Sequence, residues 1–314
     1  MKKIKKSNSL YRFIHGAVLE KGHIYIAGIA KELEDRNVPH TIIWERIEGE
    51  WKRYQWKNRT YDMAAFDSNG GTAVYVGFEG TLKVRSLQLG SSIEVLDAGN
   101  DGPSSLRPVS SIRVIGDFIY VVGMRRMIYR RALDSNIWDR FDENLRLPQN
   151  DLLITGLDSI DGLNVENLYS VGRSGEIWQY TMNNWLKVDS PTNADLYVVR
   201  CLPEGGVVIG GKDGALFIGE NNKWKQINHT FPEETFVDVE LWQNRCFVRS
   251  SNGSLFELDW KNRHELNFIQ LPSESLVMSM TITPSKIYFF GENTITSLDK
   301  NGWKDESPPD SILL

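Results

Sequence analysis

A phrase of glycines and aromatic residues recurs along this chain and constrains its fold more than any other feature. An apolar stretch leads into Gly-x-x-Gly, a second apolar stretch follows, and a tryptophan comes 13 residues after the first glycine. The two clearest copies run from Gly172 to Trp185 and from Gly211 to Trp224. Because similar units recur at a regular spacing, the sequence predicts an array built from one structural unit.

Weaker copies keep the same spacing. We call the first glycine, or its equivalent, the anchor; the anchors are Gly28, Gly77, Gly123, Gly172, Gly211, Ser250 and Gly291, at steps of 39 to 49 residues. Tryptophans close several units, namely Trp51, Trp138, Trp185, Trp224 and Trp303. Units of this length are typical of propeller blades. Seven anchors therefore predict an all-β, seven-bladed β-propeller that occupies residues 1–314 as one domain.

Each unit reads as four antiparallel strands. The Gly-x-x-Gly step predicts a tight turn, and the flanking runs are rich in the β-branched and aromatic residues that favour strands. Apolar runs ahead of the anchors are expected to be the innermost strands: 13–19, 111–115, 152–157, 196–201, 237–241 and 276–282. We expect the tryptophans on the outer strand, covering the seam between blades. A β-sandwich and a stacked solenoid are the alternative folds. Six or eight blades are also open, since polar residues 31–40 follow Gly28 where a tight turn is expected.

The composition predicts a soluble, cytoplasmic protein. Hydrophobic residues make up 41% and charged residues 25% of the chain, and no apolar run approaches the roughly 20 residues that span a membrane. Residues 1–9 predict a polar, basic tail without the apolar segment of a secretory signal. The two cysteines, Cys201 and Cys246, are expected to be buried free thiols in a reducing compartment.

The sequence shows no pattern that predicts a catalytic, cofactor or metal site. The five histidines lack close metal-ligand spacing, and neither Gly-x-x-Gly is followed by the Lys-Ser/Thr of a phosphate loop. The segment Asp158 to Gly162 is interpreted as a turn between two strands, since it lacks the alternating ligands of a calcium loop. The arginines at 125–126 and 130–131 could form a basic patch, but adjacent side chains of a strand point to opposite faces and would divide them. Since the net charge is also −5, we expect no nucleic-acid partner.

The loops between units are unusually acidic. We assign these loops to residues 57–62, 97–108, 142–151, 189–195, 229–237, 271–275 and 305–310; they hold 14 acidic and 4 basic residues, a balance of 4 − 14 = −10. One rim of the propeller is therefore expected to attract a basic partner. The candidate partner-binding residues are Asp142, Glu143, Asp151, Asp189, Asp195, Glu233 and Glu234.

The segment from Gly162 to Cys201, with Gly175-Glu-Ile-Trp-Gln-Tyr180 and Trp185, resembles bacterial WD40/YVTN-like propeller proteins encoded beside Rhs-type and type VI secretion toxins. The run from Val121 to Arg131, followed by Trp138, supports the same resemblance. The resemblance implies a non-catalytic immunity protein that binds and neutralises a cognate toxin. An acidic binder would suit a toxin with a basic surface, such as a nuclease.

Two other function classes remain open from the sequence. A carbohydrate-binding, lectin-like propeller would use exposed aromatic side chains between blades, and ten tryptophans are present. A propeller hydrolase would gather histidines or carboxylates with shifted pKa values in its central funnel, where sequence spacing does not reveal them. An immunity protein would be distinguished from both classes by a toxin gene beside the gene that encodes it.

Overall fold

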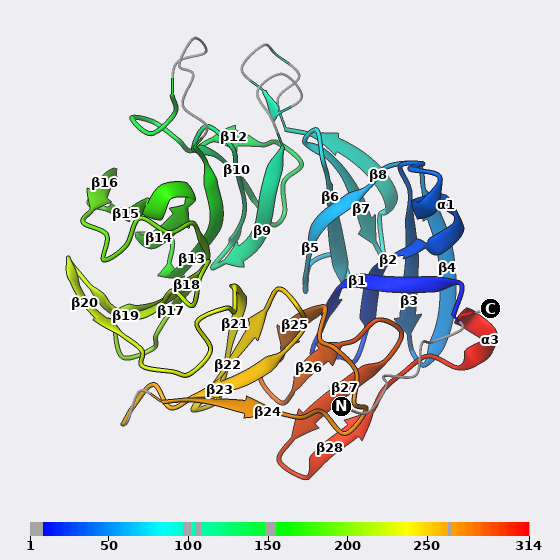
Figure 1. The fold of residues 1–314 in the computed structure, drawn as a ribbon. Helices are drawn as coiled ribbons and strands as arrows, with labels where there is room; N and C mark the ends of the chain where they lie inside the picture. The colour runs from blue at the N-terminus through cyan, green and yellow to red at the C-terminus, as the bar shows by residue number, and fades with distance from the viewer. Residues whose placement is uncertain are drawn as a thin grey trace.

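The computed structural model describes residues 9–96, 99, 102–103, 108–147, 155–262 and 265–313. Within them the chain forms seven four-stranded antiparallel sheets arranged around a central axis, which is a seven-bladed β-propeller (Figure 1). Each blade uses four strands that are consecutive in the sequence. The predicted fold class is thereby confirmed, and the basic tail predicted for residues 1–9 lies outside the described residues except for Ser9.

The first three blades come from the N-terminal half of the chain. Blade 1 consists of β1 (Tyr11–Val18), β2 (Ile24–Ala30), β3 (Thr41–Ile47) and β4 (Glu50–Trp56). Blade 2 consists of β5 (Thr60–Phe66), β6 (Thr72–Gly77), β7 (Thr81–Ser86) and β8 (Gly90–Val95). Blade 3 consists of β9 (Val109–Ile115), β10 (Phe118–Gly123), β11 (Met127–Ala132) and β12 (Asp139–Arg140).

The remaining four blades complete the ring. Blade 4 consists of β13 (Leu157–Asn164), β14 (Asn167–Gly172), β15 (Ile177–Thr181) and β16 (Asn184–Val188). Blade 5 consists of β17 (Leu196–Cys201), β18 (Val207–Gly211), β19 (Leu216–Glu220) and β20 (Lys223–Gln226). Blade 6 consists of β21 (Phe236–Trp242), β22 (Arg245–Ser250), β23 (Leu255–Leu258) and β24 (Leu266–Ile269). Blade 7 consists of β25 (Ser279–Ile282), β26 (Ile287–Phe290), β27 (Ile295–Asp299) and β28 (Gly302–Asp305).

Helical structure is short. The polar segment after Gly28 contains α1 (Lys31–Asp35), a 3-10 turn spans Arg173–Gly175, and α3 (Asp310–Leu313) follows blade 7. In Figure 1 α3 lies beside the strands of blade 1, and the indole of Trp44 donates a hydrogen bond to the carbonyl of Ile312 at 3.4 Å. No helix of the described chain has the length and apolar character needed to cross a membrane.

Four anchor glycines, Gly77, Gly123, Gly172 and Gly211, are the last residues of the second strand of their blade, and in the two clearest repeats a side chain there would collide with backbone. A Cβ atom at Gly172 would lie 1.8 Å from the carbonyl oxygen of Gly156, and one at Gly211 would lie 2.2 Å from that of Asp195. The second glycine of each phrase has positive φ, +74° at Gly175 and +71° at Gly214. In these two repeats both glycines are therefore required for geometric reasons, whereas blade 6 has Ser250 at the anchor position.

The tryptophans of the two clearest repeats occupy equivalent places, as predicted. Trp185 and Trp224 are each the second residue of the outer strand of their blade. The Trp185 indole donates to the carbonyl of Phe141 at 2.9 Å, and the Trp224 indole donates to the carbonyl of Asp189 at 2.8 Å. Each ring thus links its blade to the chain that leaves the preceding blade.

The apolar core is divided among the seams between blades. Every pair of adjacent blades encloses its own cluster of buried side chains, so that neighbouring blades cover each other's faces. The seam that closes the ring joins Phe13 and Trp44 of blade 1 to Phe290 and Ile295 of blade 7. Burial of these aromatic side chains stabilises the closed propeller. No strand is exchanged between the two ends of the chain.

One strand assignment from the sequence was wrong. Residues 158–162 were predicted to form a turn, but Leu157–Asn164 is the innermost strand of blade 4. Of the innermost strand predicted at 152–157, residues 152–154 lie outside the described residues, and of 155–157 only Leu157 belongs to this strand. The polar side chains that suggested a turn face the central channel, where Asp161 pairs with arginines of the neighbouring blades. Ion pairing in the channel satisfies a carboxylate that would otherwise be costly in an inner strand.

Candidate partner-binding face and the charged channel

The predicted binding loops lie on one face of the ring. In a four-stranded antiparallel meander, the turn between the second and third strands and the connection to the next blade leave the sheet at the same end. We call this side the inter-blade face. Its centre is the mouth of a channel of about 540 Å³ that is lined by the innermost strands of all seven blades.

Three of the predicted partner-binding carboxylates are exposed on this face. Glu143, Asp189 and Glu233 are all solvent-exposed. The backbone around Asp189 is fixed, since its N–H donates to the side chain of Asn222 at 2.7 Å and its carbonyl accepts from Trp224. This loop therefore presents its carboxylate from a defined position, which lowers the entropy that binding would cost.

Two further predicted residues are partly engaged in the fold. Asp195 accepts the N–H of Ser174 at 2.8 Å and pairs with Arg173 at 3.2 Å. Desolvation raises the pKa of Asp195, but these hydrogen bonds outweigh it and hold the pKa below its usual range. Both carboxylate oxygens of Glu234 accept from the Asn252 amide at 3.0 Å. These two carboxylates brace the turns of blades 4 and 6.

Asp142 differs from its exposed neighbour Glu143. The Asp142 side chain is 3% exposed, and Nε of Arg146 donates to it at 2.6 Å. The same carboxylate accepts the N–H of Ile128 at 3.3 Å, so it holds the end of blade 3 together. Asp151 lies outside the described residues.

Two other acidic residues counted among the loops also point inward. Asp62 belongs to β5 and accepts the N–H of Ile112 at 2.9 Å, and Glu306 is buried beside Arg46 and Lys286. The loop balance of −10 therefore overstates the charge that the rim presents to solvent. What remains is an acidic face carried mainly by exposed glutamates and aspartates of separate loops.

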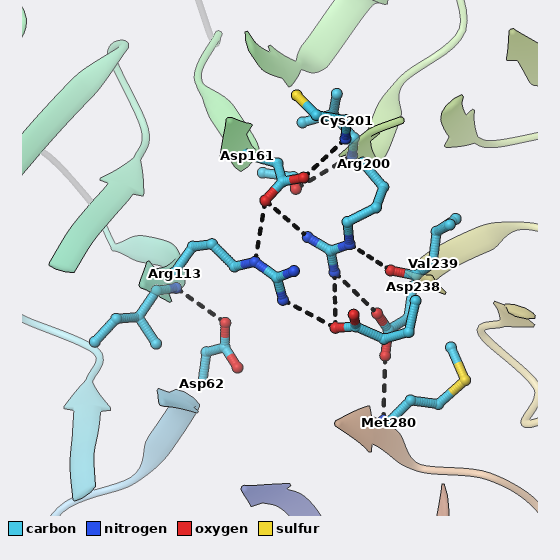
Figure 2. Close-up of polar contacts among 12 residues, drawn as sticks. Asp62, Arg113, Asp161, Arg200, Cys201, Asp238, Val239 and Met280 are labelled. Carbon is cyan, nitrogen blue, oxygen red and sulfur yellow. Dashed lines mark hydrogen bonds and ion pairs between the residues drawn. The ribbon is translucent and has the colours of Figure 1, made fainter. Parts of the chain in front are cut away.

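The channel holds a cluster of ion pairs that the sequence did not predict (Figure 2). Arg113 of blade 3 pairs with Asp161 at 3.1 Å and with Glu240 at 2.9 Å. Arg200 of blade 5 pairs with Glu240 at 3.0 Å and with Asp161 at 3.5 Å. Two arginines and two carboxylates thus alternate in a closed ring that spans blades 3 to 6. Burial lowers the pKa of Arg113, but Glu240 and Asp161 outweigh it and raise the pKa above its ordinary value.

Polar side chains also join neighbouring innermost strands directly. Asp161 accepts the N–H of Cys201 at 2.8 Å, Asp238 accepts that of Met280 at 3.3 Å, and Ser279 accepts that of Gly16 at 3.0 Å. Because innermost strands of adjacent blades belong to different sheets, these contacts satisfy backbone groups that would otherwise be unpaired. The channel wall is therefore held together by side chains from blade to blade.

Bulges aim side chains at the channel mouth. Register shifts follow the first residues of several innermost strands, and the extra residues include Tyr61, Asp158, Tyr197 and Val237, which line the channel. A bulge re-aims a side chain in this way. Alternating polar residues along these strands could have identified the channel-facing side chains from the sequence. The bulges interrupt that alternation and obscure the signal.

Among the channel-lining groups, one histidine and one carboxylate have shifted pKa values, which is the feature expected of a funnel enzyme. Burial lowers the pKa of His15 and raises that of Asp158 to about 6. Each has its own partner, since His15 Nδ1 lies 3.5 Å from Asp62 and Asp158 lies 3.0 Å from Nε of Arg173. Within the described chain, no three His, Cys, Asp or Glu side chains are placed to hold a metal ion.

The aromatic side chains serve the seams. Trp44, Trp56, Trp185, Trp242 and Trp260 are buried, and Trp303 is 38% exposed. The blade 3 arginines are likewise engaged: Arg126 pairs with Glu176, and Arg131 pairs with Glu94 at 3.1 Å. These aromatic and arginine side chains thus stabilise blade packing. Cys201 and Cys246 are both buried free thiols, as predicted.

Comparison with known proteins gives a curated relative and solved structures of similar fold. No protein-family model matches the chain. The chain is 26% identical over 310 residues to the immune protein Tsi7 of Pseudomonas aeruginosa, covering 94% of this chain and all of Tsi7. Among solved structures it is similar to YCF48 bound to a D1 peptide, with a TM-score of 0.65, 12% identity and 92% of each chain covered. The WD40 propeller domain of Doa1 gives a TM-score of 0.66 at 9% identity, with 93% of each chain covered.

Proposed function

We propose that this chain is an immunity protein, a non-catalytic propeller that binds a cognate bacterial toxin and neutralises it by contact. The observation that carries the proposal is its similarity to immune protein Tsi7, which extends over nearly the whole of both chains. A match of this extent covers all seven blades rather than one repeat, so it is not explained by repeat rhythm alone.

The proposed partner is a secreted toxin with a basic surface, such as a nuclease delivered by type VI secretion, and the proposed compartment is the cytoplasm. The exposed carboxylates Glu143, Asp189 and Glu233 support a basic partner, because charge of one sign on a face accelerates association with the opposite sign. The paired groups of the channel support a structural role for its charges.

The deciding experiment is co-expression of this chain with the toxin encoded beside it. Cells that produce the toxin should survive only when this chain is present, and the two purified proteins should elute together from a size-exclusion column. A variant with the same fold that cannot bind should fail to protect. Survival without a physical complex would contradict neutralisation by contact.

A further inference from the structure

A groove cuts into the inter-blade face above blade 7. Blade 1 continues after its anchor into α1, whereas blade 7 turns within four residues of its anchor, where the N–H of Gly291 donates to the carbonyl of Thr294 at 2.8 Å. The strands of blade 7 have four or five residues, against seven or eight in blade 1. Blade 7 is therefore lower than its neighbour, and a hollow of about 1580 Å³ lies over it.

The walls of this groove are acidic. Its lining includes the acidic residues Glu34, Asp35, Glu274 and Glu292 and the basic residues Arg12 and Lys31, a balance of 2 − 4 = −2. Arg12 and Glu34 pair at 2.8 Å. In the described part of the chain no ion pair engages Asp35, Glu274 or Glu292, so these three carboxylates can meet a cationic partner.

The groove also offers apolar contact. Phe268 of β24 is 55% exposed, although one edge of its ring packs on Phe256 with centroids 5.8 Å apart. Leu276, in the loop that leads to blade 7, is 39% exposed. Both side chains line the groove, and exposed aromatic residues held by a neighbour are typical anchors of protein interfaces.

We propose that this groove receives a basic segment of the toxin, with its cationic side chains against Asp35, Glu274 and Glu292 and an apolar side chain against Phe268 and Leu276. The inference rests on the proposed immunity function. The groove exceeds the roughly 300–1,000 Å³ of small-molecule pockets, which favours a protein segment. A second copy of this chain carries a net charge of −5 and would be repelled by acidic walls, so charge favours a basic partner.

The test compares two triple variants that change the net charge equally. The groove variant carries Asp35→Lys, Glu274→Lys and Glu292→Lys. The control carries Glu20→Lys, Asp117→Lys and Glu166→Lys, which are exposed residues in turns on the opposite face. Circular dichroism and urea unfolding establish that both are folded, and affinity for the purified toxin is measured by titration calorimetry at two salt concentrations. A third variant, Phe268→Ser, tests the apolar contact.

The groove variant should bind the toxin at least about tenfold more weakly than wild type and lose most of its salt dependence, while the control stays within about threefold. Phe268→Ser should weaken binding at both salt concentrations alike. An equal loss of toxin affinity in the groove variant and the control would overturn the proposal and would indicate only a general effect of net charge. Unchanged toxin binding with an altered sedimentation mass would assign the groove to a second copy and also overturn the proposal. If the wild-type protein binds no toxin, the proposed immunity function fails first.

Discussion

Nη1 of Arg46 in blade 1 lies 3.1 Å from Oε2 of Glu306, which follows blade 7 at a sequence separation of 260 residues. Lys286 of blade 7 donates to the other oxygen of the same carboxylate at 3.1 Å. Each blade is a contiguous segment, so no strand shared between the chain ends locks the ring. Closure depends on side-chain contacts of this kind and on the Phe13 to Phe290 seam.

Glu306→Gln should destabilise the protein by about 1–3 kcal/mol at pH 7, because it leaves Arg46, Lys286 and Lys304 beside a neutral amide. Burial raises the pKa of Glu306, but the hydrogen bonds from Lys286 and Arg46 outweigh it and lower the pKa below 4.5. The stabilisation is therefore present above pH 4.5 and is lost as the pH falls through the lower native pKa. Urea unfolding at pH 7 and pH 3.5 should show a stability difference that shrinks in acid, whereas exposed Glu143→Gln should change neither curve.

Asp161→Asn should destabilise the protein by about 2–4 kcal/mol, because Arg113 and Arg200 lose one of the two carboxylates that they share. Glu240 remains beside both arginines, and Asp238 remains beside Arg200 at 3.7 Å. The amide oxygen of asparagine can still accept the N–H of Cys201, so the loss reports mainly on charge. Urea unfolding measures it, with exposed Asp117→Asn as the control. A change below about 0.5 kcal/mol would show that the channel ring contributes no more than surface pairs do.

Substitutions at the adjacent residues Asp142 and Glu143 should differ in their effect on stability. Asp142→Asn should cost about 1–3 kcal/mol of stability, since Arg146 loses a buried carboxylate, while Glu143→Gln should stay within about 0.5 kcal/mol. Thermal unfolding of the two variants provides the comparison. Equal effects would contradict the assignment of one carboxylate to the fold and the other to the surface.

Charge reversal at Glu143, Asp189 and Glu233 together should slow association with the toxin and flatten its salt dependence. The reason is that exposed rim charges act mainly on association rate and are screened over about 8 Å at physiological ionic strength. Stopped-flow mixing measures the rate, and Glu20→Lys with Asp117→Lys and Glu166→Lys is the control of equal charge. An unchanged rate would make the acidic rim a solubility feature.

The thiols of Cys201 and Cys246 should be unreactive in the native protein, because burial raises the pKa of each above its ordinary value. A disulfide reagent at pH 8 should label them only after denaturation, at two thiols per chain. Since the native pKa values are raised, ionisation in the unfolded state should also lower stability as the pH rises above about 9. Rapid labelling of native protein would contradict their burial.

The sequence alone determined the repeat and hence the fold. Gly172 and Gly211 recur because the close approach of a carbonyl excludes any side chain, and Trp185 and Trp224 recur because each seam needs the same cover. These constraints act within one blade or between neighbours, so they return at each repeat and are visible as spacing. The same regularity predicted seven blades and the acidic loops between them.

Only the tertiary structure decided which charges belong to the fold and which to the surface. Asp142 and Glu143 are indistinguishable by loop and composition, yet one is buried against Arg146 and the other is exposed. The ring of Arg113, Asp161, Arg200 and Glu240 joins residues as far as 127 positions apart, and Arg46 meets Glu306 across 260. Such contacts form only when the ring closes, because closure brings distant blades together, in the channel for the four-residue ring and at the seam of blades 1 and 7 for Arg46 and Glu306. Local spacing therefore predicts the blades but not the partners of their charged side chains.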